Sequence, residues 1–475
     1  MNPLPGRTRA LLLALFLLAW AWRLHGLDVQ SLWRDEMDSL LFATRPLAQV
    51  LGNFTRPGEN GPLFFLGLRG WLAAAGRSEF ALRFPSAVAG VLALPLIFVW
   101  GKRLGDARLG LLAALLLAVN PYHLWYSQEG KMYALVVTLV LLGMWAFVRA
   151  AEKGGLGRWL LWLIVTTVSI YTHVLTVWIV PMQLLWLLLH PRWRRRWRDF
   201  ALALLALILP YLPLIWWQWA LLRDADFRTG YAFIPLSRML LTLFSGQLWG
   251  VLPLPARWFF APAIFLLLAA LLLPRGGVRP RRLLLIWWFL PALGLFALSL
   301  RTPFFTDRYL IWTLPALLLL IAGGLIEVAG SSRALAALLL LILLGWQTVA
   351  GWQQTAQPFK SDFRAAAVYV APRRQAQDLT LFLIPYIRHT YRYYDPGPYP
   401  WAEAPYANRE PDAAHLPAAL QAIAAGYEGL WLIESEADFY DRQGLIRGWL
   451  ATAGQLQDQA HFTRVSVYYY RLGND

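Results

Sequence analysis

Long apolar runs separated by short basic loops fill the first 350 residues of the chain. Several runs reach the roughly 18–20 residues that a helix needs to cross a bilayer. We place about eleven such spans, at about residues 8–27, 80–100, 107–126, 131–150, 158–174, 175–190, 199–221, 257–274, 283–300, 309–328 and 333–350. The run 63–75 is apolar but short, which is more typical of an interfacial or re-entrant helix. The pattern predicts an all-α polytopic membrane domain over residues 1–350, with a long outer loop at 28–79.

The pattern changes after residue 350. The long apolar runs stop, and Gln, Asp, Glu and Pro become frequent. Three segments read as strands, at 379–384, 429–434 and 465–471, and helix-like stretches lie between them, at 362–370 and 416–425. Residues 351–475 are therefore predicted to form a small α/β domain, which we expect to help bind or gate an acceptor.

The basic loops predict an orientation in the membrane. Lys and Arg cluster at alternate span ends, near residues 7–9, 102–103, 149–153, 192–198 and 275–282. Cytoplasmic loops carry an excess of these residues. This places the N-terminus in the cytoplasm and the loop 28–79, His173 and the domain 351–475 outside. The expected location is a cell membrane that the chain crosses many times.

Composition excludes several classes of protein. With 58% hydrophobic and only 15% charged residues, the chain is too apolar for a soluble protein of this length. The net charge of +16 would otherwise suggest nucleic-acid binding, but the charges lie in the short loops that set membrane orientation and contact anionic lipid headgroups. The absence of cysteine excludes disulfides, thiolate metal ligands and a catalytic thiol.

Polar groups gather at the predicted outer ends of the spans. They are Asp35 with Glu36, Glu59 with Asn60, Glu129 with Lys131, His173, and Asp307 with Arg308. A carboxylate could deprotonate an acceptor hydroxyl, and cationic side chains could neutralise a departing phosphate. Each group also has a structural alternative. Glu129 could simply pair with Lys131 and Arg308 with Asp307, and His173 could be an interfacial histidine.

Several short motifs occur together in one order along the chain. They are Leu32-Trp33-Arg34-Asp35-Glu36, Gly61-Pro62-Leu63-Phe64-Phe65, Leu82-Arg83-Phe84-Pro85, Asn120-Pro121, Ser127-Gln128-Glu129-Gly130-Lys131-Met132-Tyr133, Tyr171-Thr172-His173 and Asp307-Arg308-Tyr309-Leu310. Together they resemble the GT-C superfamily of membrane glycosyltransferases, and most of all its branch of protein O-mannosyltransferases and aminoarabinose transferases. The resemblance spans most of residues 10–350.

The resemblance implies an enzyme that transfers a sugar, with inversion, from a polyprenyl-phosphate donor to an acceptor hydroxyl on a glycan, lipid or protein. It implies that Asp35 is the general base of a catalytic pair with Glu36, which either contacts the acceptor or helps to hold the loop. The side chains that would bind the carrier phosphate and the acceptor are Glu59, Glu129, Lys131, Tyr133, His173, Arg308 and Tyr309. Relatives often carry a His-Pro-Pro or His-Gly-Pro turn where this chain has Glu59-Asn60-Gly61-Pro62, so a divalent metal stays an open question. Lys131 stands where an Arg is common, and either residue can neutralise phosphate.

Two other readings compete with a transferase. A transporter or lipid-linked-sugar flippase would also have many spans, but it predicts inverted repeats and charges near the bilayer midplane. Here no such repeat is evident, and the charges lie at span ends. A non-catalytic subunit with the same fold is the other alternative, and an intact Asp35 argues against it.

Overall fold

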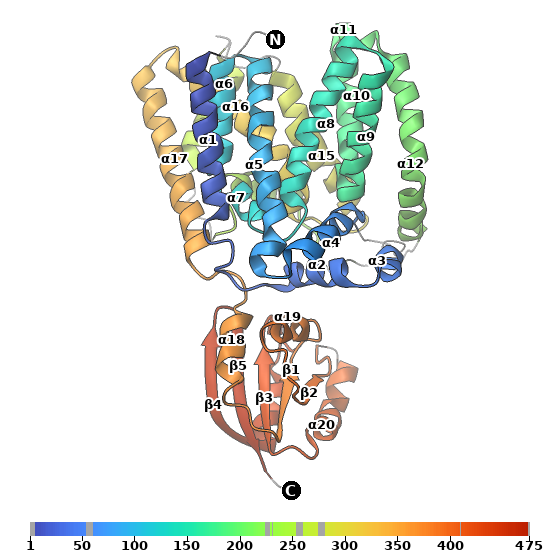
Figure 1. Cartoon of the computed structure of the whole chain (residues 1–475), viewed down its shortest axis with the longest axis vertical. Helices are drawn as coiled ribbons and strands as arrows, with labels where there is room; N and C mark the ends of the chain where they lie inside the picture. The colour runs from blue at the N-terminus through green and yellow to red at the C-terminus, as the bar shows by residue number, and fades with distance from the viewer. Residues whose placement is uncertain are drawn as a thin grey trace. The chain divides into compact units, whose positions relative to one another are not determined.

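The structure is a computed structural model of the whole chain, and it forms two compact units (Figure 1). It describes residues 5–53, 60–223, 229, 231–252, 260–273, 281–408 and 410–473. The first, here the helical unit, comprises Met1–Leu27 and Phe42–Gln354. The second, here the α/β unit, comprises Asp28–Leu41 and Thr355–Asp475. The segment Asp28–Leu41, which the sequence placed in the outer loop of the helical domain, thus packs within the α/β unit.

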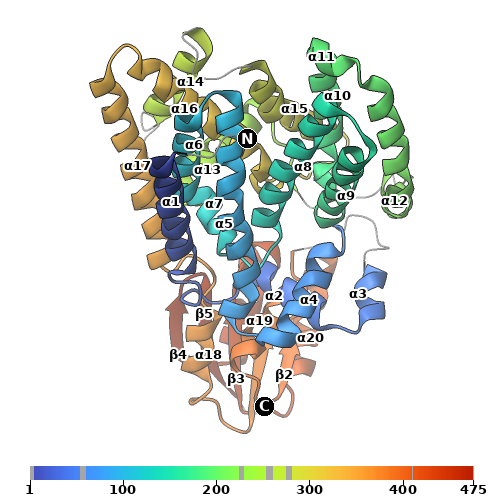
Figure 2. The same cartoon turned by 45° about the horizontal axis from the view of Figure 1, so that its top comes forward.

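Apolar helices build the helical unit, and one of them is almost entirely enclosed. The helices are α1 (Gly6–Leu24), α3 (Leu47–Asn53), α4 (Leu63–Ala75), α5 (Glu79–Leu104), α6 (Ala107–Val119), α7 (Pro121–Ser127), α8 (Tyr133–Lys153), α9 (Leu156–Thr172), η1 (Val174–Trp178), α10 (Ile179–Leu189), α11 (Pro191–Arg194), α12 (Trp197–Arg223), α13 (Leu236–Trp249), α14 (Ala261–Leu272), α15 (Arg281–Ser299), η3 (Asp307–Thr313), α16 (Leu314–Ala329) and α17 (Arg333–Ala356). The span that contains η3 and α16 is 89% buried, whereas those of α12 and α17 are 22% and 33% buried. Figures 1 and 2 show α12 and α17 on opposite flanks of the unit, where their exposed apolar faces suit lipid.

The predicted spans coincide with helices to within a few residues. Within the described residues, six helices are long and apolar enough to cross a membrane, or seven if one bent pair counts as a single span. The fold class is therefore confirmed, and the count of eleven spans stays a prediction. Helices α3 and α13 were missed. They lie in the predicted loops 28–79 and 222–256, and at 7 and 14 residues they are too short to register as spans.

The predicted span 107–126 is broken in the structure. Helices α6 and α7 meet at a bend of 60°, because Pro121 cannot continue the hydrogen-bond ladder of α6. Asn120 begins α7 instead, with its side-chain oxygen accepting from the backbone N–H of His123 at 2.9 Å. Arg23 satisfies the carbonyls of Leu117 and Ala118 that the bend frees in the last turn of α6, donating to each at 3.2 Å. A break inside a span requires such compensation, because lipid supplies no hydrogen bonds.

A five-stranded mixed sheet forms the centre of the α/β unit. Its strands are β1 (Asp378–Phe382), β2 (Trp401–Glu403), β3 (Gly429–Glu434), β4 (Gly454–Phe462) and β5 (Val465–Leu472), in the order β2-β1-β3-β5-β4. Strand β1 runs parallel to β2 and β3, and β5 runs antiparallel to β3 and β4. All five residues of β1 are buried, because helices cover both faces of the central strands.

Four helices contribute to the core of this unit. They are α18 (Phe363–Val370), α19 (Ile387–Tyr394), α20 (Glu410–Ala424) and α21 (Leu445–Ala453). Phe363, Tyr391, Leu420 and Ile446, one from each helix, are at most 2% exposed and belong to one apolar cluster with the strands. The unit therefore has a hydrophobic core of its own. A short 3-10 helix, η4 (Ala437–Phe439), precedes α21. Helix α2 (Arg34–Thr44) carries the first-loop acids Asp35 and Glu36 in its first turn.

Candidate active site

Four of the predicted substrate-binding residues meet in the helical unit. The ring centroid of His173 lies 6.1 Å from that of Tyr133 and 5.4 Å from that of Tyr309. The guanidinium carbon of Arg308 lies 5.7 Å from the centre of the Tyr133 ring. These residues come from the start of α8, the end of α9 and η3, which are far apart in the sequence. The fold thus assembles one cluster, here the aromatic–arginine cluster: Tyr133, His173, Arg308 and Tyr309.

His173 lies at a break between two helices. It ends α9 in an extended conformation, with φ −151° and ψ 113°, and η1 begins at the next residue. Its backbone carbonyl accepts from the hydroxyl of Thr176 at 2.9 Å. The side chain is 1% exposed, and within the described part of the chain neither ring nitrogen has a hydrogen-bond partner. An imidazole held this way has both nitrogens available to a ligand.

The turn between α7 and α8 carries Glu129 and Lys131. Glu129 is buried, and its carbonyl accepts from the backbone N–H of Lys131 at 2.7 Å. Gly130 between them leaves no room for a larger residue, because a Cβ there would lie 2.7 Å from Leu82 Cγ. The Lys131 ammonium lies 5.8 Å from the centre of the Phe65 ring. This places the cation beside the motif that runs from Gly61 to Phe65.

The two residues before this turn have structural roles. The hydroxyl of Ser127 accepts from Arg23 Nε at 3.3 Å and donates to the carbonyl of His123 at 2.6 Å. The amide of Gln128 donates to the carbonyls of Trp22, Arg23 and His25 at 2.8–3.3 Å. These carbonyls end α1 and have no partners within the helix. Part of the motif Ser127–Tyr133 therefore ties the turn to α1.

The turn at residues 60–62 is pressed against the end of α9. A Cβ on Gly61 would lie only 1.9 Å from the carbonyl oxygen of Tyr171. Only glycine allows so close an approach. The contact brings the Gly61–Phe65 motif next to the Tyr171–His173 motif. Glu59, the predicted site residue just before this turn, lies outside the described residues.

Helices α7 and α13 add residues near the cluster that the sequence analysis did not propose. A Cβ on Gly246 would lie 2.7 Å from Oδ2 of Asp307 and 3.6 Å from Cε2 of Tyr122. The ring centroids of Tyr122 and Tyr126 are 4.9 Å apart, and those of Tyr126 and Tyr133 are 5.1 Å apart. A row of tyrosines thus leads from Asp307 to the aromatic–arginine cluster. The only sign of this row in the sequence is that Tyr122 and Tyr126 lie between the motif Asn120-Pro121 and the motif Ser127–Tyr133.

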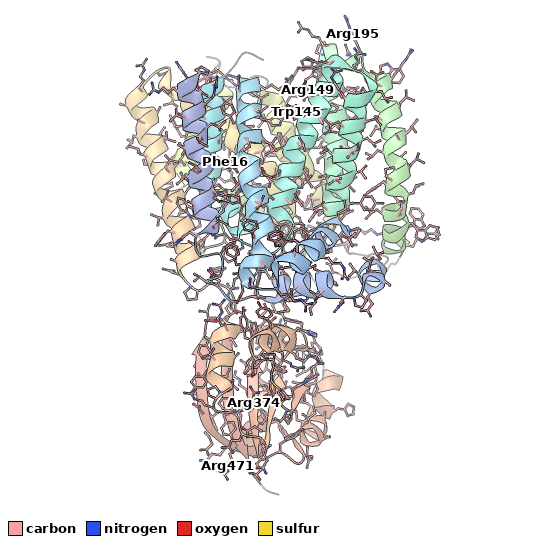
Figure 3. The ribbon with its side chains drawn as sticks, in the orientation of Figure 1. Phe16, Trp145, Arg149, Arg195, Arg374 and Arg471 are labelled. Atoms are coloured by element: carbon pink, nitrogen blue, oxygen red, sulfur yellow. The ribbon has the colours of Figure 1, made fainter. Side chains whose placement is uncertain are left out.

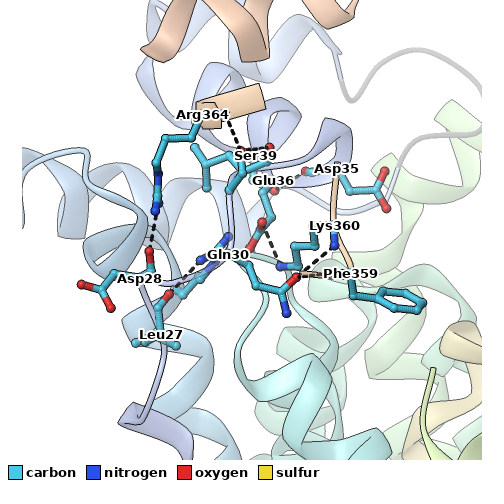
Figure 4. A network of polar contacts seen from close by, with 12 residues as sticks. Leu27, Asp28, Gln30, Asp35, Glu36, Ser39, Phe359, Lys360 and Arg364 are labelled. Carbon is cyan, nitrogen blue, oxygen red and sulfur yellow. Dashed lines mark hydrogen bonds and ion pairs between the residues drawn. The ribbon is translucent and has the colours of Figure 1, made fainter. Parts of the chain in front are cut away.

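The first-loop acids differ in their surroundings within the α/β unit. Glu36 is fully buried and its Oε2 lies 2.9 Å from the ammonium of Lys360, which is 5% exposed. Asp35 is half-buried. Figure 4 shows the two acids leaving the first turn of α2 on different sides, with Glu36 directed at Lys360. Glu36 is therefore committed to an ion pair, whereas the adjacent Asp35 carboxylate is directed elsewhere.

Within the described residues, no group of three or more His, Asp or Glu side chains lies close enough together to hold a metal ion. A metal at the turn 59–62 stays an open prediction, because Glu59 lies outside the described residues.

The aromatic–arginine cluster and the basic loops lie at opposite ends of the bundle. Helix α8 begins at Tyr133 in the cluster and ends at Lys153. Its 21 residues span about 30 Å, the thickness of the hydrocarbon core. Figure 3 shows Arg149, near the end of α8, on the same side of the helical unit as Arg195. The cluster is thus a membrane thickness away from these cations.

Known proteins resemble the chain in sequence pattern and in fold. The profile of a family described as dolichyl-phosphate-mannose-protein mannosyltransferase matches residues 59–217. No curated protein matches the chain in sequence. The crystal structure of ArnT from Cupriavidus metallidurans in the apo state matches with a TM-score of 0.60 at 14% identity, over 97% of both chains. The structure of the same protein bound to undecaprenyl phosphate matches with a TM-score of 0.57 at 14% identity, again over 97% of both chains.

The chain has the GT-C fold. A third match agrees: the archaeal oligosaccharyltransferase AglB from Archaeoglobus fulgidus, in complex with an inhibitory peptide and a dolichol-phosphate. Its TM-score is 0.59 at 13% identity, over 98% of this chain and 74% of that one. The family profile and the ArnT structures fall on the two branches that the motifs indicated, so the resemblance is confirmed. At this level of identity, the structural matches establish the fold, and the chemistry is argued from the residues.

Proposed function

We propose that the chain is a membrane glycosyltransferase that moves one sugar from a polyprenyl-phosphate carrier to an acceptor hydroxyl on the extracytoplasmic side. The observation that carries this proposal is the aromatic–arginine cluster, assembled from three distant segments at the end of the bundle away from the basic loops. The fold supports it, because ArnT has been solved with undecaprenyl phosphate and AglB with a dolichol-phosphate.

Arg308 and Lys131 would hold the carrier phosphate. A guanidinium can contact two phosphate oxygens at once, whereas an ammonium acts as a point charge. Both cations lie beside aromatic rings, Arg308 by Tyr133 and Lys131 by Phe65. Low-dielectric surroundings strengthen their attraction to the negative charge that develops on the leaving phosphate. His173 would donate a further hydrogen bond to the same group.

Asp35 would act as the general base in a single displacement. The acceptor oxygen attacks the anomeric carbon from the face opposite the phosphate, which inverts the configuration. As the bond from carbon to phosphate oxygen breaks, the acceptor proton passes to Asp35 and the polyprenyl phosphate leaves with the electron pair. A carboxylate suits this step, because it is ionised at neutral pH and accepts the proton as the hydroxyl becomes acidic. In this scheme Glu36 holds the loop.

The proposed orientation follows the basic loops. The N-terminus would lie in the cytoplasm, and the aromatic–arginine cluster and the α/β unit outside. The carrier tail would lie along apolar helix faces in the membrane. The acceptor belongs to one of three classes, glycan, lipid or protein.

The test is a transfer assay with the purified full chain in lipid nanodiscs. A panel of polyprenyl-phosphate sugars is added with candidate acceptors, and mass spectrometry follows the release of polyprenyl phosphate. We expect release with one sugar, and release slower by about 10²–10⁴-fold from an Asp35→Asn variant. A chain that moves lipid-linked sugars across sealed vesicles while leaving every carrier bond intact would be a flippase, and this proposal would fail.

A further inference from the structure

The segment Asp28–Leu41 is fastened to the rest of the α/β unit along its first half (Figure 4). The side-chain oxygen of Gln30 accepts from the backbone N–H groups of Phe359 and Lys360 at 3.1 and 2.9 Å. The guanidinium of Arg364 donates to the carbonyls of Val29 and Asp28 at 3.1 and 2.9 Å. Each of these two side chains thus bonds two backbone atoms of the opposite segment. The segments 28–30 and 359–364 are therefore held in a fixed register.

Two tyrosines, Tyr394 at the end of α19 and Tyr386 just before its start, extend the attachment toward α2. The hydroxyl of Tyr394 accepts from the backbone N–H of Leu32 at 2.7 Å. The guanidinium carbon of Arg34 lies 4.1 Å from the centre of the Tyr386 ring. Attachments therefore continue from residue 28 to residue 34, the residue before Asp35.

The ion pair between Glu36 and Lys360 completes this network on the other side of Asp35. Both side chains are at most 5% exposed, and the charged atoms are 2.9 Å apart. Taking two charges out of water is costly, and removing one partner of such a pair leaves the other charge buried and uncompensated. Lys360 is itself tied to the segment through its backbone N–H and Gln30. The pair therefore fixes the rotation of the first turn of α2.

We propose that the α/β unit sets the direction of the Asp35 carboxylate, and that Lys360 is the positioning residue that does so through Glu36. The inference rests on the proposed function, in which Asp35 is the general base. It gives the α/β unit a part in the chemistry that differs from acceptor binding or gating. Successive residues of a helix point about 100° apart, so a locked Glu36 fixes the direction in which the side chain of Asp35 leaves the helix. Figure 4 shows Asp35 pointing away from the Glu36–Lys360 pair.

The test measures turnover and local opening in the full-length chain. Lys360→Met should lower kcat by about 10–100-fold, the cost of a misplacement of about an ångström, with little change in the KM for the donor. Hydrogen exchange should rise in peptides that cover Asp28–Leu41, because the segment loses its anchor. Lys360→Arg keeps the charge and should keep most of the turnover. Unchanged exchange in this segment, or raised exchange at wild-type kcat, would overturn the proposal.

A double variant separates positioning from chemistry at Glu36. In Glu36→Gln with Lys360→Met, no charge is left buried, and neutral side chains of similar size remain. Positioning predicts that this double variant recovers kcat relative to Lys360→Met alone. If Glu36 were instead the base, Glu36→Gln and the double variant would be equally inactive, and the proposal would be wrong.

A second buried ion pair in the same unit provides the matched control. Arg374 pairs with Asp395, and their side chains are 8% and 10% exposed. Arg374→Met should raise exchange in Asp28–Leu41 less than Lys360→Met does, because its effect is centred on Asp395, and it should not lower kcat selectively. A wild-type chain that transfers no sugar, or a fully active Asp35→Asn variant, would refute the proposed function. The exchange measurement would still report whether Lys360 holds the segment.

Discussion

The guanidinium Nη2 of Arg23 lies 2.9 Å from the ring Nδ1 of His123, in the interior of the helical unit. Both side chains are fully buried. The contact joins α1 to α7, and the same guanidinium serves the freed carbonyls at the end of α6. Gly90 on α5 makes room for it, because a Cβ there would lie 2.1 Å from the Ser127 hydroxyl and 3.1 Å from Arg23 Nε. This arrangement stabilises the bend between α6 and α7. Helix α7 in turn leads into the turn Glu129–Tyr133 of the candidate site.

Replacing Arg23 should destabilise the helical unit strongly. Arg23→Met leaves the carbonyls of Leu117 and Ala118 buried without their donors, and each such loss costs about 1–3 kcal/mol. We expect a lower melting temperature in detergent, followed by intrinsic fluorescence. Arg7→Met, on the exposed part of the same helix, is the control and should melt as the wild type does. Equal melting of the two variants would contradict the capping role.

Gly61 should not tolerate a side chain. Gly61→Ala places a Cβ against the Tyr171 carbonyl, so the turn or α9 must shift, and overpacking of this kind costs about 1–3 kcal/mol. Gly67→Ala on α4 is the matched control, because no atom lies within 4 Å of its added Cβ; it should be neutral or stabilising by about 0.5–1 kcal/mol. Thermal unfolding of both variants checks this, and a stable, active Gly61→Ala would show that the close approach is not needed.

The stability of the α/β unit should depend on the ionisation of Glu434. Burial raises the pKa of this carboxyl, although the Arg447 guanidinium at 3.2 Å opposes the shift. The folded unit then binds the proton more tightly than the unfolded chain does, so this contribution to stability is present below the unfolded pKa and is lost as the pH rises through the folded pKa. Glu434→Gln should therefore stabilise the unit more at pH 7 than at pH 4. Hydrogen exchange of β3, corrected for intrinsic rates, measures the difference; an equal gain at both pH values would contradict it.

Local patterns predicted most elements, because hydropathy and alternation are local properties. The strand at 429–434 was predicted with the bounds that β3 has. Two strands were missed for physical reasons. Strand β2 has only three residues, and β4 is a polar edge strand whose alternation is interrupted by a register shift between Leu456 and Asp458.

The candidate site was harder to predict than the fold. The motifs named Tyr133, His173 and Arg308, but their meeting depends on how α8, α9 and η3 pack. No local pattern could pair Glu36 with Lys360, because the pair joins segments that lie far apart in the sequence. For the same reason, the sequence could not predict that Asp28–Leu41 belongs to the α/β unit.

Arg308→Ala should weaken carrier binding as well as turnover. The proposal assigns Arg308 to the phosphate in both the bound and the reacting state, and a charge-assisted hydrogen bond contributes about 1.5–3 kcal/mol. We expect roughly a 10–100-fold loss of affinity for polyprenyl phosphate, measured by native mass spectrometry or by competition. Arg149→Ala, at the other end of the bundle (Figure 3), removes the same charge and should leave affinity unchanged. Equal losses in both variants would indicate a general effect of net charge.

Asp35→Asn should abolish most turnover and leave carrier binding intact. The amide keeps the shape of the side chain but cannot accept the acceptor proton, and general base catalysis usually contributes about 10²–10⁴-fold in rate. Carrier affinity should persist, because cations of the helical unit hold the phosphate. Asp28→Asn is the matched control: this residue lies in the same segment, its side chain is exposed, and its contact with Arg364 is made by the backbone carbonyl. Transfer rates and carrier affinity are measured for both variants. If Asp35→Asn lost carrier binding together with turnover, Asp35 would hold structure or a ligand, and the base would have to be sought at another carboxylate such as Glu129.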